Sequence, residues 1–186
     1  MLIFTKMKKE IFEELEIPSG VEIKIGKNFV EATGKEGTVK KELNLSNIDL
    51  KIDGKKIIIG SKKATRTEKK MIYTILSHVK NLINGVQKKY EYKMKICFNH
   101  FPITIDLNGK EATIKNFLGE KIPRKAKIVE DSEVKINKDI VIVTSKNREA
   151  AGQTAANFEI ATKIRNRDRR VFQDGIFITS KCGKDI

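Results

Sequence analysis

The residue types that most often carry enzyme chemistry are few in this sequence, and none of them is spaced for catalysis. The chain holds two histidines, His78 and His100, and two cysteines, Cys97 and Cys182. Neither histidine has a second histidine, a cysteine or an acidic cluster at the spacing that a metal site or a catalytic triad requires. The two cysteines form no CxxC pair and are too few for a disulfide framework. We therefore expect no catalytic residue, no metal site and no cofactor.

The side chains best suited to binding phosphate are concentrated near the C-terminus. Four of the seven arginines lie in the segment Arg165-Asn166-Arg167-Asp168-Arg169-Arg170, and Lys163 precedes it. A planar guanidinium can donate to two phosphate oxygens at once, whereas a lysine ammonium acts as a solvated point charge. The segment follows an expected helix and holds a single acid. We predict that it forms a loop that contacts nucleic acid.

Two smaller basic groups extend that candidate surface. Lys146 and Arg148 flank the expected start of the second helix, where free backbone N–H groups also attract phosphate. Lys181 and Lys184 follow the last expected strand. The predicted nucleic-acid-binding residues are therefore Lys146, Arg148, Lys163, Arg165, Arg167, Arg169, Arg170, Lys181 and Lys184.

The charge of the whole chain indicates the same class of partner. Its 186 residues include 38 Lys and Arg against 24 Asp and Glu, a net charge of +14, and the isoelectric point is about 9.7. Such an excess attracts a polyanion. A membrane is the less favoured partner, because no basic amphipathic helix, lipidation motif or run of 18 apolar residues occurs. With nine Phe, three Tyr and no Trp, we expect binding to folded RNA through phosphate and shape rather than base stacking.

The first ten residues, MLIFTKMKKE, contain too short an apolar run for a secretory signal, so we expect a cytoplasmic location. Met1 to Lys6 can also be read as a short extension ahead of Met7. The sequence leaves open which methionine initiates.

An internal repeat supplies the elements that must position the basic residues. At an offset of 84 residues, Pro18 matches Pro102 and Ser61-Lys62 matches Ser145-Lys146. Each half shows an alternating hairpin pattern after its proline, then a second strand pair, then apolar residues at helical spacing over about residues 67–84 or 149–164, and finally a further strand. The sequence predicts an α+β fold of two tandem duplicated domains, each an antiparallel β-sheet packed against one α-helix. Residues 1–90 form the N-terminal domain and residues 91–186 the main RNA-binding domain.

Two other functions remain open at this point. Gly34-Lys35-Glu36-Gly37 has the GxxG form of the loop with which KH domains clamp an RNA backbone, which leaves a KH-like RNA-binding regulator as one alternative. That clamp joins two helices, whereas the flanking residues here are typical of strands, so we predict a tight turn. The second alternative is a basic metal-dependent nuclease. Its only candidate carboxylates are Asp49, Asp53, Glu130, Asp131 and Glu133, which lie at expected turn and hairpin positions.

Four segments, taken together with the tandem duplication, carry a resemblance to a known family. They are Ile17-Pro18-Ser19-Gly20-Val21, Thr33-Gly34-Lys35-Glu36-Gly37, Ala151-Gly152-Gln153-Thr154-Ala155-Ala156 and Arg165-Asn166-Arg167-Asp168-Arg169-Arg170-Val171-Phe172-Gln173-Asp174-Gly175-Ile176. The set resembles the family of large-subunit ribosomal protein six, called nine in eukaryotes. The last segment is the most specific and is similar to the archaeal and eukaryotic branch.

The resemblance covers about residues 10 to 185 and implies a non-enzymatic, cytoplasmic component of the large ribosomal subunit. It implies binding to 23S-type rRNA, mainly through the second domain, near the sarcin–ricin region and the factor-binding site. The implied partners are large-subunit rRNA and neighbouring ribosomal proteins, with translation factors nearby, and neither a membrane nor a small-molecule substrate. The family's first-domain turn commonly reads Gly-Pro-Lys-Gly, so Lys35 and Glu36 weaken the case for an RNA contact there.

Overall fold

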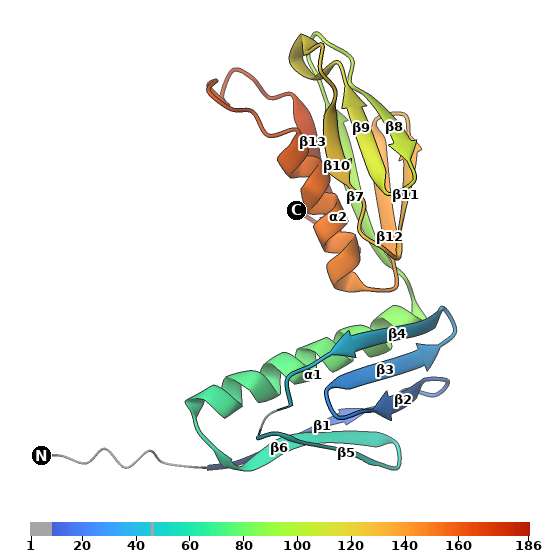
Figure 1. The fold of residues 1–186 in the computed structure, drawn as a ribbon, viewed down its shortest axis with the longest axis vertical. Coiled ribbons are helices and arrows are strands. Elements are labelled where there is room, and N and C mark those ends of the chain that lie inside the picture. Colours follow the sequence, from blue (N-terminus) through green and yellow to red (C-terminus); the bar gives the residue numbers. More distant parts are fainter. Residues whose placement is uncertain (1–8, 46) are drawn as a thin grey trace, which may run out of the picture. The chain divides into compact units, whose positions relative to one another are not determined.

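The computed structural model describes residues 9–45 and 47–186, so the question of Met1 or Met7 as initiator lies outside the described residues. The chain forms two compact units, the first ending at Lys88 and the second beginning at Lys89 (Figure 1). Each unit has its own hydrophobic core, which is aliphatic in the first unit and also contains Tyr92, Phe117 and Phe158 in the second. The α+β fold with two sheet-and-helix domains in tandem is thereby confirmed.

The described part of the first unit contains two three-stranded antiparallel sheets and one helix. The sheets have the strand orders β1-β6-β5 and β2-β3-β4. Helix α1 spans Arg66–Gln87 and packs against β1, β3, β4 and β6. The strands are β1 (Lys9–Glu16), β2 (Glu22–Ile25), β3 (Phe29–Gly34), β4 (Gly37–Glu42), β5 (Asp49–Asp53) and β6 (Lys56–Ala64).

Helix α1 begins and packs as its sequence dictates. Thr65 is the N-cap, and a capping box forms because its side chain accepts from the Thr67 backbone while Glu68 accepts from the Thr65 backbone N–H at 2.9 Å. One face of the helix carries Ile72 and Val79 at helical spacing, and both are at most 1% exposed. The helix predicted over about residues 67–84 is confirmed and continues to Gln87.

The second unit contains a three-stranded sheet of order β10-β9-β8 and a five-stranded sheet of order β11-β12-β7-β13-β14. Helix α2 (Arg148–Ala161) packs against both sheets, contacting β10 of the smaller one and β11, β12, β7 and β13 of the larger one. A short 3-10 helix, η1 (Phe117–Gly119), precedes β10. The strands are β7 (Tyr90–Cys97), β8 (Thr104–Asn108), β9 (Glu111–Lys115), β10 (Arg124–Lys127), β11 (Ser132–Asn137), β12 (Ile140–Ser145), β13 (Gly175–Lys181) and β14 (Lys184–Asp185).

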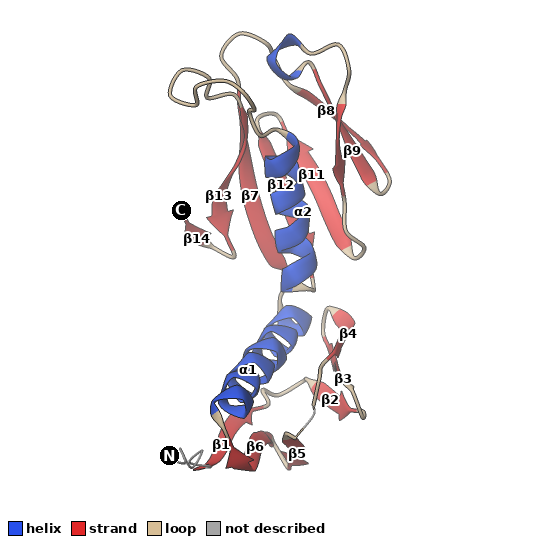
Figure 2. Ribbon diagram, turned by 60° about the vertical axis from the view of Figure 1, so that its left-hand side comes forward, coloured by secondary structure: helices blue, strands red, loops and turns tan. Residues whose placement is uncertain are grey.

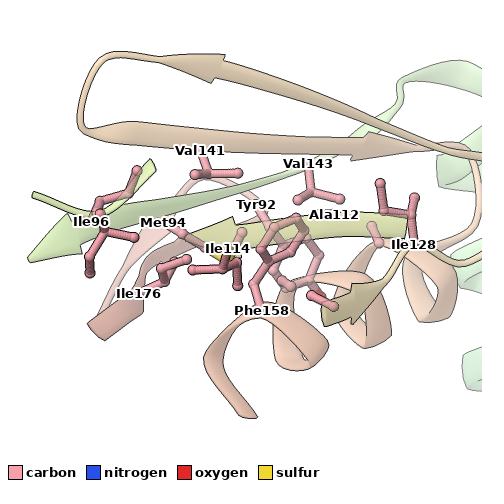
Figure 3. Packing of buried hydrophobic residues seen from close by; sticks show 14 of the residues in the cluster. Tyr92, Met94, Ile96, Ala112, Ile114, Ile128, Val141, Val143, Phe158 and Ile176 are labelled. Carbon is pink, nitrogen blue, oxygen red and sulfur yellow. The ribbon is translucent and has the colours of Figure 1, made fainter. Parts of the chain in front are cut away.

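The core of the second unit depends on small residues in α2. Ala151 and Ala155 are fully buried, and such side chains let a helix approach a sheet closely. Phe158 is also fully buried, and Figure 3 shows it among core side chains that include Tyr92 and Ile176. The end of α2 that carries the basic loop is therefore attached to a well-packed core.

The two units share a plan, and the order of elements differs from the predicted one in a specific way. The pairing β1-β6-β5 in the first unit matches β7-β12-β11 in the second, and β2-β3-β4 matches β8-β9-β10. The strand expected to close the first half, residues 90–98, is the opening strand of the second unit. Its counterpart β1 was not predicted, and neither were β10 and β14. Strand β13 has no counterpart in the described part of the first unit and adds to the free side of β7.

Candidate nucleic-acid interface

Residues 162–174 form a loop that connects α2 to β13, which we call the arginine loop. Figure 2 shows it beyond the C-terminal end of α2. The prediction of a loop after the second helix is confirmed, although the helix ends at Ala161 rather than near Ile164. All five predicted basic residues of the loop are exposed, namely Lys163, Arg165, Arg167, Arg169 and Arg170. They are accompanied by two carboxylates, so the loop is strongly positive.

A buried threonine holds the two ends of the arginine loop together. The Thr162 hydroxyl donates to the Phe158 carbonyl at 3.1 Å and accepts from the Ile176 backbone N–H at 3.0 Å. Thr162 is only 3% exposed, so both hydrogen bonds are shielded from water. The loop therefore leaves α2 and enters β13 at fixed positions.

Arg124 on β10 provides a second support for the loop. Its Nη1 donates to the carbonyl oxygens of Ala161 at 2.9 Å and Lys163 at 3.2 Å. Its Nε and Nη2 donate to the two carboxylate oxygens of Glu120 at 2.7 and 2.6 Å, and this bonding lowers the pKa of Glu120. The guanidinium carbon lies 4.3 Å from the centre of the Phe117 ring. Sequence reasoning missed Arg124, because a lone arginine distant from the basic cluster gives no signal.

Interactions within the arginine loop shape its tip. The Asp168 carboxylate accepts from the Arg170 backbone N–H at 2.9 Å and from the Arg170 Nη2 at 2.9 Å. These hydrogen bonds lower the pKa of Asp168. The Phe172 backbone N–H donates to the Asp168 carbonyl at 2.9 Å, and the Arg167 guanidinium lies 4.8 Å from the Phe172 ring centre. Two of the five cations are thus held by neighbours in the loop.

The other three cations of the loop are available for binding. The side chains of Lys163, Arg165 and Arg169 make no ion pair or hydrogen bond with the residues that the structure describes. An exposed guanidinium that is bonded only to water can exchange that water for phosphate oxygens. The loop consequently offers several cations on a braced backbone.

The remaining predicted residues gather at the opposite end of α2, in a group that we call the second basic cluster. Asn147 caps the helix by accepting from the Glu149 backbone N–H at 3.0 Å, which places Lys146 and Arg148 at its N-terminus. Arg148 hydrogen-bonds the Tyr92 hydroxyl, and this bond raises its pKa. The cluster consists of Lys146, Arg148, Lys181 and Lys184.

The β13–β14 hairpin joins this cluster through Tyr92. Lys181 pairs with Tyr92 across the β13 and β7 ladder, and Lys184 pairs with Lys181. Burial, followed by the hydrogen bond to Cys182 at the hairpin turn, raises the pKa of Tyr92. Helix α2 has 14 residues, so it separates the second basic cluster from the arginine loop by about 20 Å. The predicted site is therefore two groups of cations rather than one.

An open groove of about 1000 Å³ lies beside the arginine loop, at the C-terminal end of α2 and the end of β7. Its lining includes Phe98, Ile160, Val171 and Phe177, and these side chains are 42 to 72% exposed. Lys163 and Arg169 of the arginine loop also line it. No pattern in the sequence predicted the groove, since its walls come from three separate segments.

The GxxG segment of the first unit is the turn of a hairpin, as predicted. Gly34 ends β3, Gly37 begins β4, and the two residues pair across the ladder. A Cβ at Gly34 would lie 2.9 Å from both the Val86 carbonyl oxygen and Val86 Cγ2. The glycine is therefore explained by close contact with the end of α1.

The acidic residues considered for a nuclease are divided between the two units. Asp49 and Asp53 lie on β5, while Glu130 pairs with Lys110 and Glu133 with Lys89 in the second unit. Within residues 9–45 and 47–186, no group of three metal-ligating side chains is found. Neither helix in this part of the chain combines the length and apolar character needed to cross a bilayer.

Comparison with known proteins identifies the family to which this chain is similar. The sequence model described as Ribosomal protein L6 matches residues 17–89 and 101–175, a range that covers most of both units and the whole arginine loop. The chain is 42% identical to large ribosomal subunit protein uL6 of Methanococcus vannielii, over 94% of this chain and 96% of that protein. The uL6 protein of Methanocella arvoryzae is 43% identical over 95% of this chain and its own full length, and that of Staphylothermus marinus is 44% identical over 90% and 93%.

Proposed function

Because the chain belongs to the ribosomal protein L6 family, we propose that it is a structural component of the large ribosomal subunit, without enzymatic activity, that binds 23S-type rRNA mainly through its second unit. Its relatives in three archaea are large-subunit proteins that align with it over nearly their whole length. The family membership supports a cytoplasmic, ribosome-associated location.

The arginine loop is the observation that carries the RNA-binding part of this proposal. It presents Lys163, Arg165 and Arg169 without partners among the described residues, on a backbone fixed by Thr162 and Arg124. A fixed backbone reduces the entropy lost when long cationic side chains dock onto phosphates. Binding then occurs by neutralisation of phosphates and release of their counterions.

The resemblance of the loop supports a proposal for the site of attachment. The segment from Arg165 to Ile176 is similar to the archaeal and eukaryotic branch of the family. That similarity supports a contact near the sarcin–ricin region and the factor-binding site, with neighbouring ribosomal proteins as further partners. Translation factors would then pass close to the second unit.

A titration of the full chain against a large-subunit rRNA fragment tests the RNA-binding proposal. If six to ten phosphates are contacted, affinity should fall by roughly 10³–10⁵ between 50 and 200 mM salt. Replacing Arg165 and Arg169 with Ala should weaken binding strongly, whereas replacing Lys62 and Lys63 on β6 of the first unit should change it little. Equal losses for the two pairs would show that the arginine loop is not the binding site.

Assembly into the ribosome requires a separate experiment. The tagged chain expressed in an archaeal host should co-sediment with the large subunit in low-salt gradients and be released only at high salt. Recovery of the chain at the top of the gradient would instead favour a free RNA-binding regulator.

A further inference from the structure

Asp174, at the end of the arginine loop, is a buried carboxylate that the fold does not use. It is 6% exposed, and it makes no ion pair or hydrogen bond with any described residue. Burying a carboxylate without a partner is costly, and such groups are normally bonded. Asp174 lines the groove beside the arginine loop. No wholly buried side-chain oxygen in the described part of the chain lacks a partner, so the carboxylate oxygens of Asp174 keep some exposure, and the groove that this residue lines accounts for it.

The walls of the groove limit what can occupy it. Phe98 and Phe177 are 43 and 42% exposed, which leaves aromatic surface available for contact with a flat group. Lys163 and Arg169 also line the groove, and they attract a group that carries negative charge. The occupant must therefore have a flat ring, donors for the buried carboxylate and an anion at the rim.

These three properties are combined in a nucleotide, and the carboxylate selects among the bases. A carboxylate accepts two hydrogen bonds side by side. Guanine alone presents two adjacent donors, N1–H and the N2 amino group, on its Watson–Crick edge. Adenine, cytosine and uracil each present an acceptor next to their donor, and that acceptor would face the carboxylate oxygen.

We propose that the groove receives one unpaired guanine of the bound RNA, with Asp174 accepting from N1–H and N2–H, Phe98 and Phe177 contacting the ring, and Lys163 and Arg169 binding its phosphate. The inference rests on the proposed rRNA binding and adds a base-specific contact to it. Proteins that recognise RNA sequence commonly bind such extruded bases. An arginine side chain of a neighbouring protein would also satisfy Asp174, but Lys163 and Arg169 would repel it.

Nucleotide titrations of the full chain, followed by ¹H–¹⁵N NMR, test the groove directly. Guanosine 5′-monophosphate should shift the amide signals of Phe98, Gly175 and Phe177 in a saturable way, and bind about tenfold more tightly than the adenosine, cytidine or uridine monophosphate. Equal affinities for the four nucleotides, or shifts confined to the tip of the arginine loop, would overturn the proposal. Shifts of the same amides by N-acetylarginine amide but not by the guanosine nucleotide would assign the groove to a protein partner.

Two substitutions make the test specific. Asp174→Asn should abolish the preference for guanosine, because the amide NH₂ opposes the donors of the base. Asp139→Asn, in the turn between β11 and β12, should leave the preference unchanged, since Asp139 does not line the groove. If the Asp174→Asn variant does not give the dispersed NMR spectrum of a folded chain, Phe98→Ala is the variant to test in its place. It should lower the affinity for the guanosine nucleotide.

Measurements of rRNA binding distinguish a failure of the guanine contact from a failure of the proposed function on which it rests. Asp174→Asn should weaken binding of the rRNA fragment about tenfold without changing the salt dependence, because the carboxylate contacts no phosphate. Full affinity in that variant would refute the guanine contact alone. Failure of the wild-type chain to bind rRNA would refute the proposed function itself.

Discussion

At the scale of single residues, the exposed cations could be read from the sequence and their supports could not. Arg165 and Arg169 were predicted to bind RNA because a cluster of closely spaced arginines is visible in the sequence itself. Arg124 contributes through carbonyl oxygens that lie 37 and 39 residues further along the chain, and Asp174 matters because it is buried without a partner. Both properties arise only when distant segments meet, so no local pattern contains them.

Arg124→Ala should alter RNA binding although Arg124 is placed to hold the loop rather than the RNA. Loss of its hydrogen bonds to Glu120 and to the end of α2 should lower the free energy of unfolding by about 1–2 kcal/mol. The rRNA affinity should fall several-fold while the slope against salt stays the same, because no phosphate contact is removed. Urea unfolding and salt-dependent titrations measure the two effects. A reduced slope would mean that Arg124 binds phosphate directly.

The Glu120–Arg124 ion pair should also make the free energy of unfolding depend on pH. The pKa of Glu120 is lowered in the folded chain from its ordinary value of 4.5. As the pH falls, Glu120 is therefore protonated in the unfolded state before it is protonated in the folded state. The stabilisation by the ion pair is complete above about pH 4.5 and is lost as the pH falls through the lower pKa of the folded state. Glu120→Gln should reduce stability at pH 7 and show a smaller difference from the wild-type chain below pH 4. A constant difference across this range would exclude the ion pair as the cause.

At the scale of elements, prediction worked where the hydrophobic period was strong. Helix α1 and the hairpins around Asp53-Gly54 and Asn108-Gly109 were predicted because both their periodicity and their turn residues are clear. Strand β1 was missed because four glutamates obscure the alternation of its half-buried side chains, and β10 because it buries only Ala126. The pairing of β1 with β6 and of β7 with β13 depends on contacts far apart in sequence. The order of the strands within each sheet therefore could not be predicted from the sequence.

Gly34→Ala tests whether the GxxG turn is structural. The added Cβ would lie 2.9 Å from the Val86 backbone carbonyl, so the hairpin or the end of α1 must shift. The Glu36 N–H, which donates to the same carbonyl at 2.9 Å, would also be displaced. We expect a loss of about 1–3 kcal/mol in the free energy of unfolding. Lys35→Ala in the same turn should change it by less than about 0.5 kcal/mol, and neither variant should alter rRNA affinity at a temperature where it is folded.

At the scale of the whole molecule, the repeat predicted the two-unit plan, but it could not show how the second unit diverged. The second unit adds β13 to the free side of β7, and the arginine loop is the connection that brings the chain there from α2. The same strand carries Lys181 back towards Arg148 through the Tyr92 pairing. Strand β13 therefore ends the arginine loop and brings Lys181 of the second basic cluster into place, whereas Lys146 and Arg148 lie at the start of α2, an element that both units have.

The separation of the two groups leads to a final prediction about their additivity. They lie about 20 Å apart along α2, more than the Debye length of about 8–10 Å at 0.10–0.15 M salt, so they should act independently. Replacing Arg165, Arg167 and Arg169 with Ala should lower the slope of log affinity against log salt by about 2–3, and replacing Lys146, Lys181 and Lys184 should do the same. The variant with all six replacements should show the sum of the two reductions. If the second set leaves the slope unchanged, the RNA contacts the arginine loop and not the second basic cluster.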